Sequence, residues 1–143
     1  MAVIIPDSHK DLLVNPVHGV LTTMMPDGQP HMSVIWVDYD GTHVLLSSTL
    51  ERQKGKNIQK NPKVNILVID PKNVSRFIEI RGEVVEITQD GAVDLVNKLT
   101  EAYTNGKKQR YYGDIFPVEN KENETRVIFK ILPMKVNVNA IFA

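Results

Sequence analysis

Five basic side chains stand within thirteen residues, directly after a run of hydroxyl side chains. Residues 51–63 contain one acid, Glu51, so their local charge is +4, and their basic residues are Arg52, Lys54, Lys56, Lys60 and Lys63. The hydroxyl run before them is Ser47-Ser48-Thr49. If the basic segment begins a helix, the free N–H groups and the dipole at its start favour an anion. These features together indicate a phosphate-binding site, and a solvated polar helix with ordinary lysines is the alternative interpretation.

The overall composition excludes several classes of function. The 143-residue chain has 17 basic and 17 acidic residues, so it has no global field to attract nucleic acid. It has no cysteine, which excludes a disulfide scaffold, a thiol nucleophile and a Cys-based metal site. A small nucleic-acid-binding barrel that used the same basic segment would need aromatic side chains for stacking, and residues 50–63 contain none. We therefore expect no nucleic acid among the partners.

Common catalytic motifs are also missing from the sequence. The four histidines show no His-Glu-x-x-His spacing, so we expect no metal site. There is no Gly-x-Ser-x-Gly elbow, no Walker loop and no Gly-x-Gly-x-x-Gly run. The run Tyr111-Tyr112-Gly113-Asp114 is either a lid over a substrate or a packed loop.

The elements that must position these residues are mostly strands. Alternating or β-branched apolar runs predict strands over residues 17–25, 31–37, 42–49, 64–69, 76–87, 126–132 and 134–140. The first three, joined by two tight turns, predict an antiparallel meander. Helical spacing predicts helices over 51–62 and 92–103, with one or two helical turns before Pro16. About seven strands with two to three helices predict a single antiparallel barrel domain over residues 1–143, mainly β with some α structure.

Two further features bear on location and strand geometry. The N-terminal residues show no targeting segment, and no apolar run approaches the ~20 residues that cross a bilayer. We therefore expect a cytoplasmic protein that does not enter a membrane.

Gly82 stands inside the strand predicted over 76–87, where glycine marks a bulge, a bend or a close backbone approach. Residues 105–123 are polar and carry no clear pattern.

The order of several short motifs resembles the pyridoxamine-5'-phosphate-oxidase-like, split-barrel flavin-binding family over about residues 15 to 88. These motifs are Gly19-Val20-Leu21-Thr22-Thr23, Asp27-Gly28-Gln29-Pro30, Ser47-Ser48-Thr49, Arg52-Gln53-Lys54, Asn61-Pro62 and Arg81-Gly82-Glu83-Val84. The resemblance implies a homodimer of split barrels with two flavin-type cofactors at the subunit interface.

The resemblance also implies roles for individual residues. Arg52 and Lys54 would hold the cofactor phosphate, and the hydroxyl run, Ser47, Ser48 and Thr49, would supply hydroxyl or backbone donors. The segment Ser33-Val34-Ile35-Trp36 would line the ring system, and Phe77 would reach the cofactor from the partner subunit. Core packing is the alternative for Trp36 and Phe77, and plain exposure on a strand is the alternative for Ser33.

Departures from the family pattern narrow the expected activity. Ser33 and Gln53 stand where true pyridoxamine phosphate oxidases have arginine, and the chain lacks their long C-terminal substrate-binding region, so vitamin B6 oxidation is not expected. The short length and the Arg-x-Lys spacing are more similar to the branch that uses the deazaflavin coenzyme F-420, whose tail would suit Lys56 and Lys60. We expect hydride transfer between that coenzyme, or else FMN or FAD, and a small unsaturated organic molecule. The alternative is a non-catalytic binding or carrier protein of the same fold.

Overall fold

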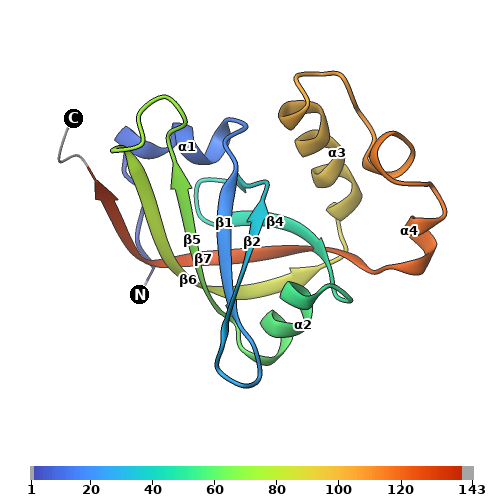
Figure 1. Ribbon diagram of the computed structural model, residues 1–143, viewed down its shortest axis with the longest axis horizontal. Coiled ribbons are helices and arrows are strands. Elements are labelled where there is room, and N and C mark those ends of the chain that lie inside the picture. The colour runs from blue at the N-terminus through green and yellow to red at the C-terminus, as the bar shows by residue number, and fades with distance from the viewer. Residues whose placement is uncertain (1, 140–143) are drawn as a thin grey trace.

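One curled antiparallel sheet forms the body of the protein. The computed structural model describes residues 2–139, and within them seven strands pair in the order β2-β1-β5-β6-β7-β4-β3 (Figure 1). Every neighbouring pair is antiparallel. The strands are β1 (Gly19–Met24), β2 (Pro30–Ile35), β3 (Asp38–Tyr39), β4 (Val44–Thr49), β5 (Lys63–Ile69), β6 (Phe77–Thr88) and β7 (Arg126–Asn139). The fold is the split β-barrel that the sequence predicts.

The barrel closes because its two edge strands are consecutive in the chain. β2 and β3 lie at opposite ends of the strand order, yet only Trp36 and Val37 separate them. So short a link brings both edges of the sheet together and forces the sheet to curl. The predicted meander of the first three long strands is wrong, because β4 pairs with β3 and β7 and not with β2. The two-residue link redirects the chain to the far edge instead of turning it back.

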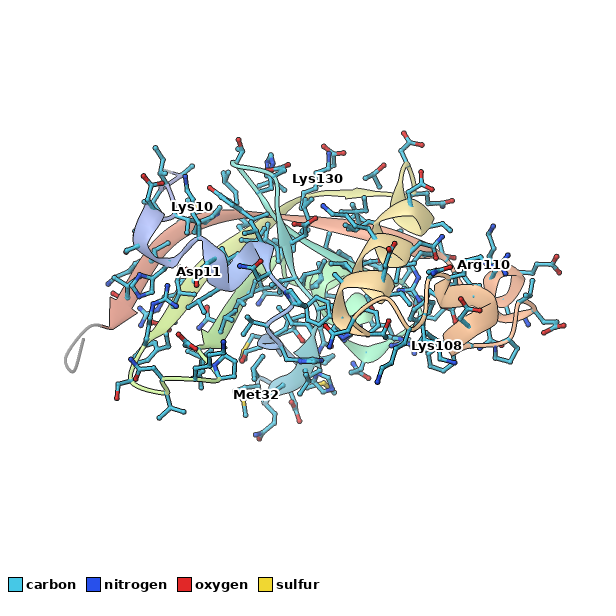
Figure 2. The ribbon with its side chains drawn as sticks, turned by 90° about the horizontal axis from the view of Figure 1, so that it is seen from above. Lys10, Asp11, Met32, Lys108, Arg110 and Lys130 are labelled. Carbon is cyan, nitrogen blue, oxygen red and sulfur yellow. The ribbon has the colours of Figure 1, made fainter. Side chains whose placement is uncertain are left out.

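The helices lie at the ends and on one side of the barrel. They are η1 (Asp7–His9), α1 (Asp11–Val14), α2 (Gln53–Lys60), α3 (Ala92–Tyr103), η2 (Tyr111–Ile115) and α4 (Asn120–Asn123). α3 has the predicted bounds, whereas α2 is shorter than predicted and ends where Asn61 precedes Pro62. Residues 105–123, which carry no pattern in the sequence, form η2 and α4 beside α3 (Figure 1). Lys108 and Arg110 lie at this end of the molecule, and α1 lies at the other (Figure 2).

Gly82 allows β6 and β7 to approach each other closely. The register of this pair shifts between Arg81 and Gly82, which confirms the predicted bulge. A Cβ atom at Gly82 would stand 2.6 Å from Cγ2 of Ile131 and 2.9 Å from the carbonyl oxygen of Leu132. β7 continues through Pro133 as one strand, although the sequence suggests two runs, and the predicted end at Ala140 lies outside the described residues.

Two layers of buried apolar side chains support the structure. The larger one fills the barrel and includes Leu21, Ile80 and Phe129, each at most 1% exposed. The other lies under α3, where Leu95 and Leu99 pack against Ile128. Burial of this kind, at about 25 cal/mol per Å² of apolar surface, is the main stabilising contribution. Across residues 2–139, no helix is long and apolar enough to span a membrane.

Candidate functional site

A cavity of about 210 Å³ lies between the barrel and the α3–η2 side of the molecule. Strands β1, β2, β4 and β7 supply one wall, and α2, α3 and η2 supply the others. The lining residues are Leu21, Val34, Ile35, Trp36, Leu46, Ser47, Ser48, Arg52, Lys54, Val96, Leu99, Tyr111, Ile115, Phe116, Arg126 and Phe129. Cofactor pockets usually have about 300–1,000 Å³. A ligand of that size would therefore extend beyond this cavity.

Two of the cavity's cations come from the start of α2. Arg52 precedes the helix, and its Nη2 donates a hydrogen bond to the hydroxyl of Tyr111 at 3.2 Å. Lys54 is half-buried, and its Nζ donates to Oγ of Ser33 at 3.4 Å, which is a long contact. Burial lowers the pKa of Lys54, and repulsion from Arg52 and Arg126 lowers it further. The amine is therefore short of negative partners.

Close packing and a buried amide fix α2, and with it Lys54, in this position. A Cβ atom at Gly55 would stand only 2.0 Å from the carbonyl oxygen of Thr49, so the helix lies directly against the end of β4. Nδ2 of the buried Asn57 donates to Oγ1 of Thr23 in β1 at 3.0 Å. Oγ1 of Thr49 accepts from the backbone N–H of Arg52 at 3.3 Å. The Thr49 side chain thus fixes the chain entering α2 and does not line the cavity.

Ser48 has a buried hydroxyl that the protein leaves unused. The residue is 3% exposed, it lines the cavity, and its Oγ has no hydrogen-bond partner among the described residues. Leaving a buried polar group unsatisfied costs about 1–3 kcal/mol. This hydroxyl lines the same cavity as Arg52 and Lys54, and it fits an anionic ligand that would complete its hydrogen bonding.

The apolar wall is rigid because aromatic side chains support it. The Trp36 ring stacks on Tyr103 with centroids 5.2 Å apart and planes at 17°. The Tyr103 hydroxyl donates to the carbonyl of Val17 at 2.9 Å and accepts from the backbone N–H of Val37 at 3.1 Å. Trp36 therefore packs against its neighbours and also lines the cavity, while its contact with a cofactor ring stays a prediction. Val34 and Ile35 line the same cavity.

The structure adds three residues that sequence reasoning missed or left open. Arg126, the first residue of β7, lines the cavity and is 7% exposed. Its Nε donates to the hydroxyl of Tyr112 at 3.1 Å, and its Nη2 donates to Glu124 at 3.0 Å. Tyr111 and Tyr112 are both buried, so this run is a packed wall and not an open lid. Arg126 could not be found from the sequence, because no hydroxyl or basic run surrounds it.

The predicted site residues divide into two groups. Seven of the ten line the cavity. Ser33 does not line it but contacts Lys54, which does, and Thr49 accepts a hydrogen bond from the backbone of Arg52. Phe77 lies elsewhere: it is half-buried and borders a depression on the outer face of β1, β2, β5 and β6. The cofactor-binding roles of these residues, and the partner-subunit role of Phe77, stay predictions. No cluster of three or more metal-ligating side chains occurs within residues 2–139.

Comparisons with known proteins give a consistent result. Residues 5–140 match the family described as pyridoxamine 5'-phosphate oxidase. A pyridoxine/pyridoxamine 5'-phosphate oxidase of Rhodopseudomonas palustris is 28% identical over 131 residues, which cover 91% of this chain and 58% of the relative. The chain thus spans little more than half the length of this curated relative.

Solved structures agree with the sequence match. An F-420 reductase superposes with a TM-score of 0.78 at 33% identity, over 93% of this chain and 98% of that one. A conserved hypothetical protein from Mycobacterium tuberculosis superposes with a TM-score of 0.68 at 22% identity, over 96% and 86% of the two chains, and shares the fold. With the family match over residues 5–140 and a cavity that gathers cations and hydroxyls beside an aromatic wall, the chain belongs to the pyridoxamine 5'-phosphate oxidase family.

Proposed function

We propose that this protein is an oxidoreductase that binds a flavin-type cofactor and transfers a hydride between it and a small unsaturated organic molecule. The observation that carries the proposal is the composition of the cavity. Arg52, Lys54 and the hydroxyl of Ser48, which has no hydrogen-bond partner among the described residues, line the same cavity as Trp36. This combination suits a cofactor with an anionic end and a planar ring system.

The cations and hydroxyls would bind the anionic end of the cofactor. Arg52 and Lys54 supply the charge, and charge-assisted hydrogen bonds to phosphate are about twice as strong as neutral ones. Ser47 and Ser48 supply hydroxyl donors from β4. A phosphate would also place a negative charge beside Lys54, whose pKa is lowered by burial and by repulsion from Arg52 and Arg126.

The apolar walls would orient the ring and exclude water. Val34, Ile35 and Trp36 form one side, and Leu99 and Phe116 face the same cavity. When bound, the cofactor supplies the hydride chemistry, while the protein sets its position and its access to water. A site of this kind therefore functions without an acid–base pair of its own.

We favour the deazaflavin coenzyme over FMN and FAD. The F-420 reductase matches this chain over nearly the whole length of both, at 33% identity, whereas the curated oxidase is 28% identical and considerably longer. Ser33 contacts Lys54 at a position where we expect arginine in oxidases of vitamin B6. For these reasons we do not propose pyridoxamine phosphate as the substrate.

The functional unit that we propose is a homodimer with the cofactor at the subunit interface. Met32 and Val34 in β2 are 69% and 67% exposed, and Met32 projects outward from the strand (Figure 2). Together with Phe77 and Leu67, Met32 borders the depression on the outer face of the sheet. A second copy covering this face would bury apolar surface and enlarge a cavity that is too small for a whole cofactor.

Titration of the purified protein with the deazaflavin coenzyme, FMN and FAD, followed by absorbance and fluorescence, tests the proposal. We expect at least one to bind with a dissociation constant below about 100 μM, and binding by none of them would refute the proposal. Turnover of the reduced cofactor with a panel of quinones and enones then distinguishes a reductase from a carrier. A carrier would bind the cofactor and leave every acceptor unreduced.

A further inference from the structure

We propose that Arg126 is a ligand-binding residue of this site and that, with Arg52 and Lys54, it makes the cavity selective for a ligand end that carries two negative charges. The inference rests on the proposed function and adds a specificity to it. Arg126 comes from β7, whereas the other two cations come from the start of α2. All three line one cavity.

The guanidinium group of Arg126 is held in place by several contacts, but not all of its N–H donors are used. Its guanidinium carbon lies 4.5 Å from the centre of the Tyr111 ring, and its Nε and Nη2 bond to Tyr112 and Glu124. Nη1 makes only a long contact of 3.4 Å to Oγ of Ser47. An arginine has five N–H donors, and these contacts with described residues use three of them. The remaining donors belong to a side chain that is 7% exposed and lines the cavity.

The charges around the cavity do not balance. Among the described residues, Glu124 is the one acid that forms an ion pair with any of these three cations. The pKa of Lys54 is lowered by burial, then by Arg52 and Arg126, and no acid offsets these effects. Three positive charges against one negative charge leave a surplus of about two. A ligand end with two negative charges would neutralise that surplus, whereas a single charge would leave one cation unpaired in a partly buried site.

Two ligand chemistries provide two charges at one end. A phosphate monoester, as in FMN, is close to a dianion above pH 7 because its second pKa is about 6. The tail of the deazaflavin coenzyme, a phosphodiester followed by glutamate carboxylates, provides at least two. Unmodified riboflavin provides none. Comparing ligands that share one ring system and differ in charge therefore tests the effect of the charge alone.

Binding to the full-length protein tests the proposal without any turnover. At pH 7.5 we measure dissociation constants for riboflavin, the methyl phosphodiester of FMN, and FMN, which carry zero, one and two negative charges. A parallel series compares the deazaflavin coenzyme with its carboxylate methyl esters. We expect the doubly charged ligand of at least one series to bind about 10-fold or more tightly than its singly charged analogue. Equal affinities within every series whose members bind would overturn the inference and leave the proposed function intact, whereas no binding by any ligand would overturn both.

Three variants assign the selectivity to Arg126. Arg126→Met should reduce the preference for the doubly charged ligand to about threefold or less, whereas Arg126→Lys should keep most of the preference. Glu124→Gln retains Arg126 and removes the offsetting charge, so it should strengthen binding of the doubly charged ligand about 2–5-fold. This variant keeps the test decisive if Arg126→Met does not fold. The proposal would be overturned if the preference survives in Arg126→Met, or if Glu124→Gln binds the doubly charged ligand no more tightly than the wild type does.

Discussion

Nη2 of Arg52 lies 3.2 Å from the hydroxyl oxygen of Tyr111, although 59 residues separate the two in the chain. This hydrogen bond joins the start of α2 to η2 across the cavity. A face of the Tyr111 ring lies against Arg126, whose guanidinium carbon is 4.5 Å from the ring centre. The buried Tyr111 side chain therefore contacts two cations, one through its hydroxyl and one through its ring.

Removing the hydroxyl of Tyr111 should make the Arg52 side chain less ordered while leaving the Tyr111 ring in place. Tyr111→Phe retains the ring that Arg126 contacts and deletes one hydrogen bond, so we expect the free energy of unfolding to fall by about 0.5–1.5 kcal/mol. Cofactor affinity should fall about 2–5-fold because Arg52 loses an acceptor that fixes its side chain. Urea unfolding and cofactor titration measure the two effects. Identical values for Tyr111→Phe and the wild type would show that the Arg52 contact contributes nothing.

Lys54 should reduce the stability of the ligand-free protein. Burial and two neighbouring cations disfavour its charge, so Lys54→Met should raise the melting temperature at pH 7 by about 2 °C or more and weaken cofactor binding. A lowered lysine pKa means that the folded state binds fewer protons than the unfolded state between the lowered value and about 10.4. The wild type should therefore gain stability relative to Lys54→Met as pH rises through this interval. Lys56→Met, at an exposed position in the same helix, serves as the control.

Gly55 should tolerate no side chain. A Cβ atom there would stand 2.0 Å from the carbonyl oxygen of Thr49, which is backbone and cannot rotate away. We expect Gly55→Ala to lower the free energy of unfolding by about 2 kcal/mol or more, even though alanine is the better helix former. Lys60→Ala, at an exposed position of α2, should change stability by less than about 0.5 kcal/mol. Equal stability of Gly55→Ala and the wild type would contradict the close packing of α2 on β4.

A charge on the outer face of β2 should break the proposed dimer. Met32→Glu places a carboxylate at a position that is 69% exposed in one chain, so the isolated chain should fold normally. Burying that carboxylate against a second copy would be costly, and we expect sedimentation to show a dimer for the wild type and a monomer for the variant. Val118→Glu, at a position 60% exposed between η2 and α4, should remain dimeric. A monomeric wild type at the concentration used would refute the dimer.

The ion pairs of Arg76 should make stability depend on pH in the acidic range. Arg76 donates to Asp11 beside the N-terminal helices and to Asp70 in the β5–β6 turn. The Arg76 hydrogen bond lowers the pKa of Asp11, and the backbone N–H of Lys72, followed by Arg76, lowers that of Asp70. Carboxyl groups with lowered pKa values stabilise the fold above about pH 4 and lose this effect as pH falls through those values.

Arg76→Met should therefore melt below the wild type at pH 7, and the difference should shrink as pH falls below about 4. Arg81→Met removes an ion pair to Glu79 at a side chain that is 52% exposed, and it should have a smaller effect at both pH values. Melting curves of the three proteins at pH 7 and at pH 3 provide the comparison. A difference between wild type and Arg76→Met that is as large at pH 3 as at pH 7 would exclude the ionised carboxylates as its source.

Local signals in the sequence were sufficient for most elements. The apolar spacing over residues 92–103 predicts α3 with its observed bounds, because a helix repeats its contacts every three to four residues. Pro26, Asp27 and Gly28 predict the β1–β2 turn, and Gly28 adopts a φ of 87°, which glycine readily permits. Arg52, Lys54 and Ser48 could be proposed as a group because they are neighbours in the chain.

The sequence by itself thus determined the main helix, the basic junction, the family pattern and the positions of the longer strands, since each depends on residues that are close in the chain. It did not predict β3, and it divided β7 into two runs at Pro133. The tertiary structure decided which strands pair and which residues enclose the cavity. The pairing of β4 with β7, and the meeting of Arg126 with Ser47 across 79 residues, both depend on how the sheet closes after Trp36 and Val37. That closure follows from burying apolar surface over the whole chain, and no local pattern encodes it.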